Sequence, residues 1–126
     1  MFNKKILIVD DDVLNKDLLA DYLMRKGFKN VLTAAKADET LQKIKTEKPD
    51  LIILDIALED YIDGVEILRR TKAGLSPNSK VVMLSGHKGA YENECQRLGA
   101  VEFWSKPINP NVILENIKRL LSASQK

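Results

Sequence analysis

Five short runs rich in apolar and β-branched residues, each followed by a stretch suited to a helix, set the strongest constraint on the fold of this chain. The strand-like runs are Lys4–Val9, Asn30–Ala34, Leu51–Asp55, Lys80–Leu84 and Val101–Trp104. The expected helices are Asp11–Lys26, Ala37–Glu47, Val65–Ala73, Ala90–Leu98 and a last one that begins at Asn109 or Asn111. Regular alternation of strand and helix predicts an α/β protein with a mainly parallel sheet and helices on both faces.

The length of the chain and the handedness of its connections narrow the topology. Its 126 residues suffice for one domain with a substantial core and are too few for two ordinary ones. Right-handed crossovers leave few arrangements of five parallel strands, and we expect a doubly wound sheet with the strand order 2-1-3-4-5. We therefore expect a single domain over residues 1–126, with its core at about 4–121 and with 122–126 as a frayed tail or the start of a linker.

Composition and charge argue against several classes of protein. The formal net charge of +2 is nearly balanced and the basic residues are scattered, which gives no case for binding nucleic acid or a membrane surface. The single cysteine, Cys95, excludes an intrachain disulfide and a multi-cysteine metal site. The chain enters a strand by Ile6, with no room for a signal peptide, and no apolar run approaches the ~20 residues of a membrane span. We expect a cytosolic protein.

Polar residues stand where the strands end. Asp10 and Asp11 follow the first strand, Asp55 ends the third, Ser85 follows the fourth, and Lys106 comes soon after the fifth. Because the carboxyl ends of parallel strands share one edge of the sheet, these side chains would meet in the crevice where open α/β sheets bind ligands.

A cluster of carboxylates needs compensation. Two like charges about 4 Å apart repel by about 4 kcal/mol at an effective dielectric of about 20, so protons or a cation must neutralise the cluster. Oxygen ligands without a nearby His or Cys favour Mg²⁺ over Zn²⁺, and Mg²⁺ keeps positions open for phosphoryl oxygens. Lys106 and Ser85 would add a positive charge and a hydroxyl, which suits phosphoryl transfer. Asp55 is then the candidate nucleophile, because carboxylates form acyl-phosphate intermediates.

Each of these residues taken alone is equally typical of ordinary structure. Acids directly after a strand often cap the next helix, and we assign Asp12 to that role. Asp55 and the Ser85-Gly86 pair are common in turns. Only their joint placement at four strand ends favours a functional site.

Six segments of the sequence are similar to those of a known family. They are Ile6–Asp12, Pro49–Asp55, Asp63-Gly64, Val81–Gly86, Gly99-Ala100 and Lys106-Pro107. As a set, in this order and spacing, they resemble the receiver domain of two-component response regulators, over about residues 4–121. The resemblance implies the flavodoxin-like (βα)5 fold of the chemotaxis regulator, with the strand order 2-1-3-4-5.

The resemblance also implies the roles of the site residues. Asp55 would accept a phosphoryl group from the phosphohistidine of a sensor histidine kinase or a phosphotransfer protein. Asp10, Asp11, Asp55 and the backbone carbonyl of Ala57 would bind Mg²⁺, and Lys106 would pair with the phosphoryl oxygens. Such a domain catalyses its own phosphorylation and dephosphorylation and is not a turnover enzyme on an external substrate.

A conformational response is implied as well. Ser85 would move to hydrogen-bond the phosphoryl group, and Phe103 would follow it as the switch aromatic. The face built from the fourth helix, the fifth strand and the fifth helix would then bind a downstream protein or an output domain. No contact with nucleic acid or membrane is expected from this domain.

The chain departs from the family pattern after Asp55. The loop Ile56–Asp63 lacks the usual proline, is one residue longer, and carries extra negative charge on Glu59 and Asp60. His87 stands where the family tunes dephosphorylation, and Trp104 is expected to be a strand residue that faces a helix.

Two other functions remain open. The runner-up is an interaction module of receiver architecture that works without phosphorylation, which the altered loop favours. The third is a small phosphatase or a flavin-binding protein, but the sequence has no glycine-rich phosphate loop and no second domain to close a substrate pocket.

Overall fold

Five parallel strands form one sheet in the computed structural model of the chain, which describes residues 1–86 and 91–123. The strands are β1 (Lys5–Val9), β2 (Asn30–Ala34), β3 (Leu51–Asp55), β4 (Lys80–Ser85) and β5 (Glu102–Ser105). Their order across the sheet is β2-β1-β3-β4-β5, and every neighbouring pair is parallel. The predicted doubly wound sheet is therefore confirmed.

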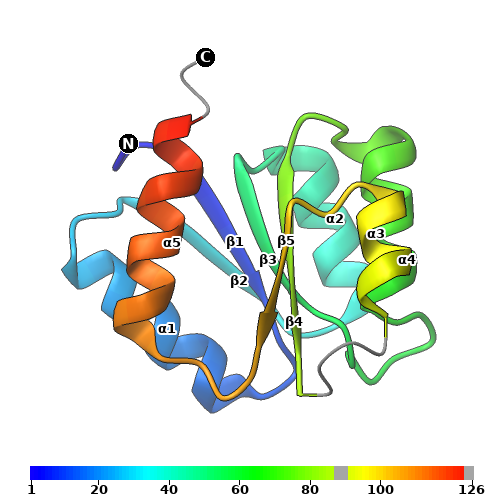
Figure 1. Ribbon diagram of the computed structural model, residues 1–126, viewed down its shortest axis with the longest axis horizontal. Coiled ribbons are helices and arrows are strands. Elements are labelled where there is room, and N and C mark those ends of the chain that lie inside the picture. The colour runs from blue at the N-terminus through cyan, green and yellow to red at the C-terminus, as the bar shows by residue number, and fades with distance from the viewer. Residues whose placement is uncertain (87–90, 124–126) are drawn as a thin grey trace.

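Helices cover both faces of the sheet. They are α1 (Val13–Arg25), α2 (Ala37–Glu47), α3 (Gly64–Arg70), the π-helical turn η1 (Thr71–Leu75), α4 (Glu92–Leu98) and α5 (Pro110–Ala123). Helices α1 and α5 lie on one face and α2, α3 and α4 on the other, while the carboxyl ends of the strands point to a common edge (Figure 1). None of the described helices is both long enough and apolar enough to cross a bilayer.

Two apolar clusters hold these layers together. Alternate residues of each central strand point to opposite faces: Ile6 and Ile8 join the cluster under α1 and α5, whereas Leu7 and Val9 join the cluster under α2, α3 and α4. All residues of β3 are buried, as expected for a strand covered on both faces. The last helix faces the sheet with a stripe of five buried residues: Ile113, Leu114, Ile117, Leu120 and Leu121.

Local signals explain where most elements begin and end. The side chain of Asp12 accepts a hydrogen bond from the Asn15 N–H at 3.3 Å and caps α1, so the helix starts at Val13 rather than at Asp11. Gly27 follows this helix with φ of +111°, a left-handed conformation that suits glycine. Pro110 is the first residue of α5, where its missing N–H costs nothing.

Other bounds differ from the prediction. The expected helix Val65–Ala73 is a short α3 that continues as η1, in which the Ser76 N–H donates to the Thr71 carbonyl five residues earlier. Strand β5 starts at Glu102, one residue later than predicted, and Val101 before it is 43% exposed. Ala90, the predicted start of the fourth helix, lies outside the described residues, and α4 begins at Glu92.

Candidate functional site

Three carboxylates meet at the carboxyl ends of β1 and β3. One oxygen each from Asp10, Asp11 and Asp55 lies within 4.8 Å of the other two. Asp10 and Asp55 are each only 3% exposed, while Asp11 is half-buried. The proximity follows from the register, since Val9 pairs with Leu54 and both strands reach their polar residues at the next position.

Lys106 contributes a positive charge to the same place. Its Nζ lies 3.2 Å from Oδ2 of Asp55 and 3.5 Å from Oδ2 of Asp10. Strand β5 delivers it there: Ser105 pairs with Ser85 on β4, and the Lys106 N–H donates to the Ser85 carbonyl at 2.8 Å. The predicted acids and lysine are thus brought together, with a formal charge that remains negative.

The electrostatic cost of this arrangement shows in the pKa values of two groups. Burial raises the pKa of Asp10, a hydrogen bond from the Asp12 N–H lowers it, and the nearby Asp55 raises it further, so that the net shift is upward. For Lys106 burial is the largest single influence and lowers the pKa, but the attraction of Asp55 and Asp10 outweighs it and the pKa rises. The site therefore favours bound positive charge, whether as protons or as a cation.

Backbone N–H groups orient the three carboxylates. The Asp12 N–H donates to Oδ1 of Asp10 at 2.9 Å, and the Ala57 N–H donates to Oδ1 of Asp55 at 3.1 Å. The Glu59 N–H donates to Oδ2 of Asp11 at 3.1 Å. Each acid accepts a backbone N–H on one oxygen, and for Asp10 and Asp55 the other oxygen faces Lys106.

These residues fit a hard divalent cation. Carboxylate oxygens in small number are the donors that Mg²⁺ and Ca²⁺ prefer, and within residues 1–86 and 91–123 no thiol or imidazole joins the three acids. A cation would also relieve the repulsion that raises the pKa of Asp10. Which ion binds, and whether the Ala57 carbonyl joins the ligands, stay predictions.

The predicted switch residues lie on β4 and β5. Ser85 is buried at the end of β4, one position after Leu84, which pairs with Asp55. Phe103 is half-buried against the apolar cluster under α2, α3 and α4. His87 lies outside the described residues.

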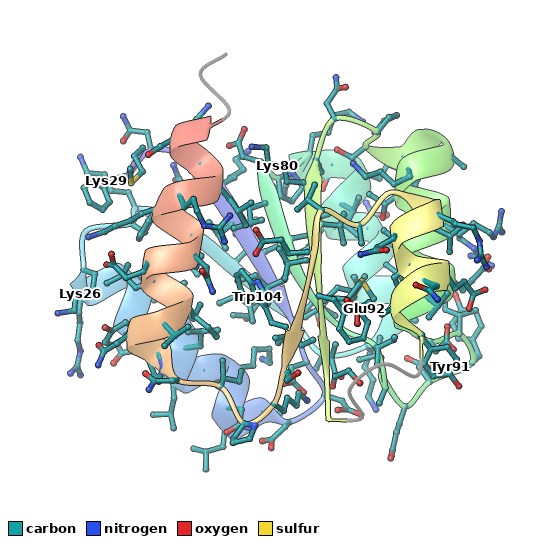
Figure 2. All side chains as sticks on the ribbon, viewed as in Figure 1. Lys26, Lys29, Lys80, Tyr91, Glu92 and Trp104 are labelled. Atoms are coloured by element: carbon teal, nitrogen blue, oxygen red, sulfur yellow. The ribbon has the colours of Figure 1, made fainter. Side chains whose placement is uncertain are left out.

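Trp104 points to the opposite side of the sheet from Phe103. It packs against the cluster under α1 and α5, and Figure 2 shows it on the side of β5 toward α5. Its Nε1 donates to Oε1 of Glu102 at 2.7 Å, and Glu102 also pairs with Arg119 of α5. The expectation that Trp104 faces a helix is confirmed.

The loop after Asp55 is packed more tightly than its sequence suggests. Ile56 and Leu58 are buried, while Ala57 is exposed between them. Gly64 starts α3 directly against the strand end, and a Cβ there would stand 2.3 Å from the Asp55 carbonyl oxygen. Only glycine fits at this position without displacing the backbone that carries Asp55.

Sequence reasoning missed the polar contacts of this loop. Oδ2 of Asp60 accepts a hydrogen bond from the Ala37 N–H at 2.8 Å, and the Tyr61 hydroxyl donates to Oδ1 of Asp38. One signal in the sequence pointed to a cap from elsewhere in the chain. Lys36, directly before α2, has no side-chain oxygen to cap the helix.

Comparisons with known proteins agree with this geometry. The family model described as response regulator receiver domain matches residues 6–118. The alkaline phosphatase synthesis transcriptional regulatory protein PhoP of Bacillus subtilis is 36% identical over 98% of the chain, which spans 50% of that protein. Sporulation initiation phosphotransferase F of the same organism is 32% identical, with 96% of each chain covered.

A solved structure shows the same architecture. The response regulator receiver domain protein (CheY-like) from Methanospirillum hungatei superposes with a TM-score of 0.89 and 35% identity. The match covers 98% of this chain and 97% of that one.

Proposed function

Because the chain belongs to the family of response regulator receiver domains, we propose that it is a phosphorylation-operated signalling switch with Asp55 as the phosphoacceptor. The observation that carries the proposal is the buried Asp55 carboxylate, which contacts Lys106 and lies against two further acids. The phosphoryl donor is the phosphohistidine of a sensor histidine kinase or of a phosphotransfer protein.

Phosphoryl transfer makes one bond and breaks one. A bond forms between phosphorus and an oxygen of Asp55 as the bond from phosphorus to the histidine nitrogen breaks, which leaves an acyl phosphate on Asp55. The Ala57 N–H holds Oδ1 of Asp55 and so fixes the plane of the carboxylate. Lys106, 3.2 Å from Oδ2, is placed to pair with oxygens of the incoming phosphoryl group.

The acid cluster gives the reaction its metal requirement in this proposal. Asp10, Asp11 and Asp55, with the carbonyl of Ala57, would hold Mg²⁺, which supplies positive charge to phosphoryl oxygens when bound. Asp10 and Asp11 take no direct part in bond making. Their role is to hold the positive charge beside Asp55.

The response to phosphorylation passes through β4 and β5. Ser85 turns to hydrogen-bond the phosphoryl group, and Phe103 follows with a change of rotamer. The face formed by α4, β5 and α5 then binds a downstream protein or an output domain.

The chemistry is confined to the domain itself. Residues 1–126 act as a single domain that catalyses its own phosphorylation and slow dephosphorylation and turns over no external substrate. The near-balanced net charge of +2 offers nucleic acid little attraction.

Intact-protein mass spectrometry tests the proposal. Incubation with acetyl phosphate and Mg²⁺ should add the mass of one phosphoryl group, and the Asp55→Asn variant should gain none. Omission of Mg²⁺, with EDTA present, should prevent the gain. Failure of the unaltered protein to be labelled, or labelling of Asp55→Asn, would favour the module that works without phosphorylation.

A further inference from the structure

Hydrogen bonds at two neighbouring residues connect the loop Ile56–Asp63 to two different parts of the molecule. At Glu59 the backbone N–H donates to Oδ2 of Asp11 at 3.1 Å, in the acid cluster. At Asp60 the carboxylate accepts from the Ala37 N–H at 2.8 Å, at the start of α2. The two hydrogen bonds involve adjacent residues of the loop, so the position of one residue constrains the position of the other.

The second hydrogen bond caps the N-terminus of α2, which has no capping side chain of its own. The residue before α2 is Lys36, which makes no side-chain cap, and the N–H groups of the first helical turn have no partners within the helix. Asp60 supplies the missing acceptor from a distance of 23 residues along the chain. A carboxylate is also favoured at the positive end of a helix dipole.

Further hydrogen bonds fix this carboxylate in one orientation. Its Oδ1 accepts the N–H of Tyr61 at 2.8 Å, and the Tyr61 hydroxyl donates to Asp38 of α2. Hydrogen bonds from Ala37 and Tyr61 hold the pKa of Asp60 below its usual range, so it stays ionised at neutral pH. One carboxylate oxygen of Asp60 therefore bonds to α2, and the other bonds to the backbone of the loop itself.

We propose that Asp60 is a positioning residue for cation binding at the acid cluster. By docking the loop on α2, it keeps the Glu59 N–H against Asp11 and keeps the Ala57 backbone, three residues earlier, beside Asp55. The buried Leu58 between them makes this stretch a short and packed connection. The inference rests on the proposed function, because the cation it serves is the one required for phosphorylation of Asp55.

If Asp60 acted only through its charge, its substitutions would change cation affinity in a different pattern than if it positions the loop. Asp60 carries a negative charge near the cluster, and loss of that charge alone would weaken cation binding. Glu59 is the matched control: it is the adjacent acid, it is exposed, and its side chain makes no hydrogen bond or ion pair among residues 1–86 and 91–123. Glu59→Gln therefore reports the loss of one charge without loss of the cap.

The first measurement is Mg²⁺ affinity by calorimetry, at a temperature where all variants are folded by circular dichroism. Asp60→Ala should weaken Mg²⁺ binding about tenfold, the low end of the loss seen when a group that orients a metal ligand is removed. Asp60→Asn keeps an oxygen for the Ala37 N–H and should bind Mg²⁺ as Glu59→Gln does. Equal affinity in Asp60→Ala and Glu59→Gln, or equal weakening in Asp60→Asn and Asp60→Ala, would overturn the proposal.

The second measurement tests whether Mg²⁺ binding strengthens the cap of α2 in return. If capping of α2 and cation binding are coupled, saturating Mg²⁺ must strengthen the cap by the same factor by which the cap strengthens Mg²⁺ binding. Amide hydrogen exchange at Ala37 should therefore slow when Mg²⁺ is added to the unaltered protein. A cap that serves only the stability of α2 would leave this exchange rate unchanged.

The outcomes separate this inference from the proposed function. If the unaltered protein binds Mg²⁺ and Asp60→Ala binds it as well as Glu59→Gln does, only the positioning role of Asp60 is wrong. If the unaltered protein binds no Mg²⁺, both the metal requirement and the positioning role are wrong.

Discussion

The two halves of the site are built in different ways. Asp10, Asp55 and Lys106 stand at or just beyond strand ends, and the two acids are almost fully buried. Ala57, Glu59 and Asp60 belong to an irregular loop, are exposed, and are held by a few hydrogen bonds. The sheet therefore sets the positions of the buried acids and the lysine, whereas the loop beside them depends on contacts that one substitution can remove.

The two halves also differ in the direction in which the fold shifts the pKa of an acid. Burial raises the pKa of Asp10, so its charged form is disfavoured in the fold. Hydrogen bonds lower the pKa of the exposed Asp60, so its charged form is favoured. The strand ends therefore favour bound positive charge, whereas the Asp60 carboxylate is already stabilised by hydrogen bonds within the protein.

The largest effect is expected where the two halves touch. Gly64→Ala would place a methyl group 2.3 Å from the Asp55 carbonyl oxygen and 2.8 Å from Cα of Ile56. Backbone must move to admit it, and we expect the free energy of unfolding to fall by about 3 kcal/mol in urea titrations. Gly86→Ala is the control, since a Cβ there meets nothing within 4 Å among the residues that the structure describes. Equal stability of the two variants would contradict the close packing of α3 on the strand end.

Within the strand-borne half, Lys106→Met should slow phosphorylation most. Removal of a donor that stabilises developing charge costs about 10²-fold in rate. The measurement is the rate of mass gain with acetyl phosphate at saturating Mg²⁺. Lys29→Met, at the far end of β2, should react at the unaltered rate. If Lys106→Met reacted at that rate too, the contact with Asp55 would have no catalytic role.

The smallest effect is a pH dependence in the loop-borne half. Hydrogen bonds hold the folded pKa of Asp60 below the ordinary value of an aspartate, so its contribution to stability is present above that ordinary pKa and is lost as the pH falls through the folded value. Asp60→Ala should therefore lower the urea midpoint at pH 7, and the difference from the unaltered protein should shrink in strong acid. A difference that grew toward low pH would contradict the hydrogen bond to Ala37.

The strand-borne half was predictable from sequence because topology fixes it. Once the order of strands is known, the residues after Val9 and Leu54 must be neighbours, which placed Asp10, Asp11 and Asp55 together. The same reasoning brought Lys106 to the cluster from the end of β5.

The features that the sequence did not predict depend mostly on contacts between residues far apart in the chain. The cap from Asp60 to Ala37 has no local pattern, and η1 replaces the helix end predicted at Ala73. Leu14 and Leu18 stand at the four-residue spacing of a helix but are 68% and 60% exposed, so helical spacing alone does not tell which face of α1 meets the sheet.

The location of the phosphoryl group tests the central claim most directly. After reaction with acetyl phosphate and Mg²⁺, borohydride reduction converts a phosphorylated aspartate to homoserine, and tandem mass spectrometry of the digested protein locates it. We predict homoserine at position 55 and at no other acid of the cluster. Modification at Asp10 or Asp11, or a phosphoryl group that resists borohydride, would contradict the assignment of Asp55 as the phosphoacceptor.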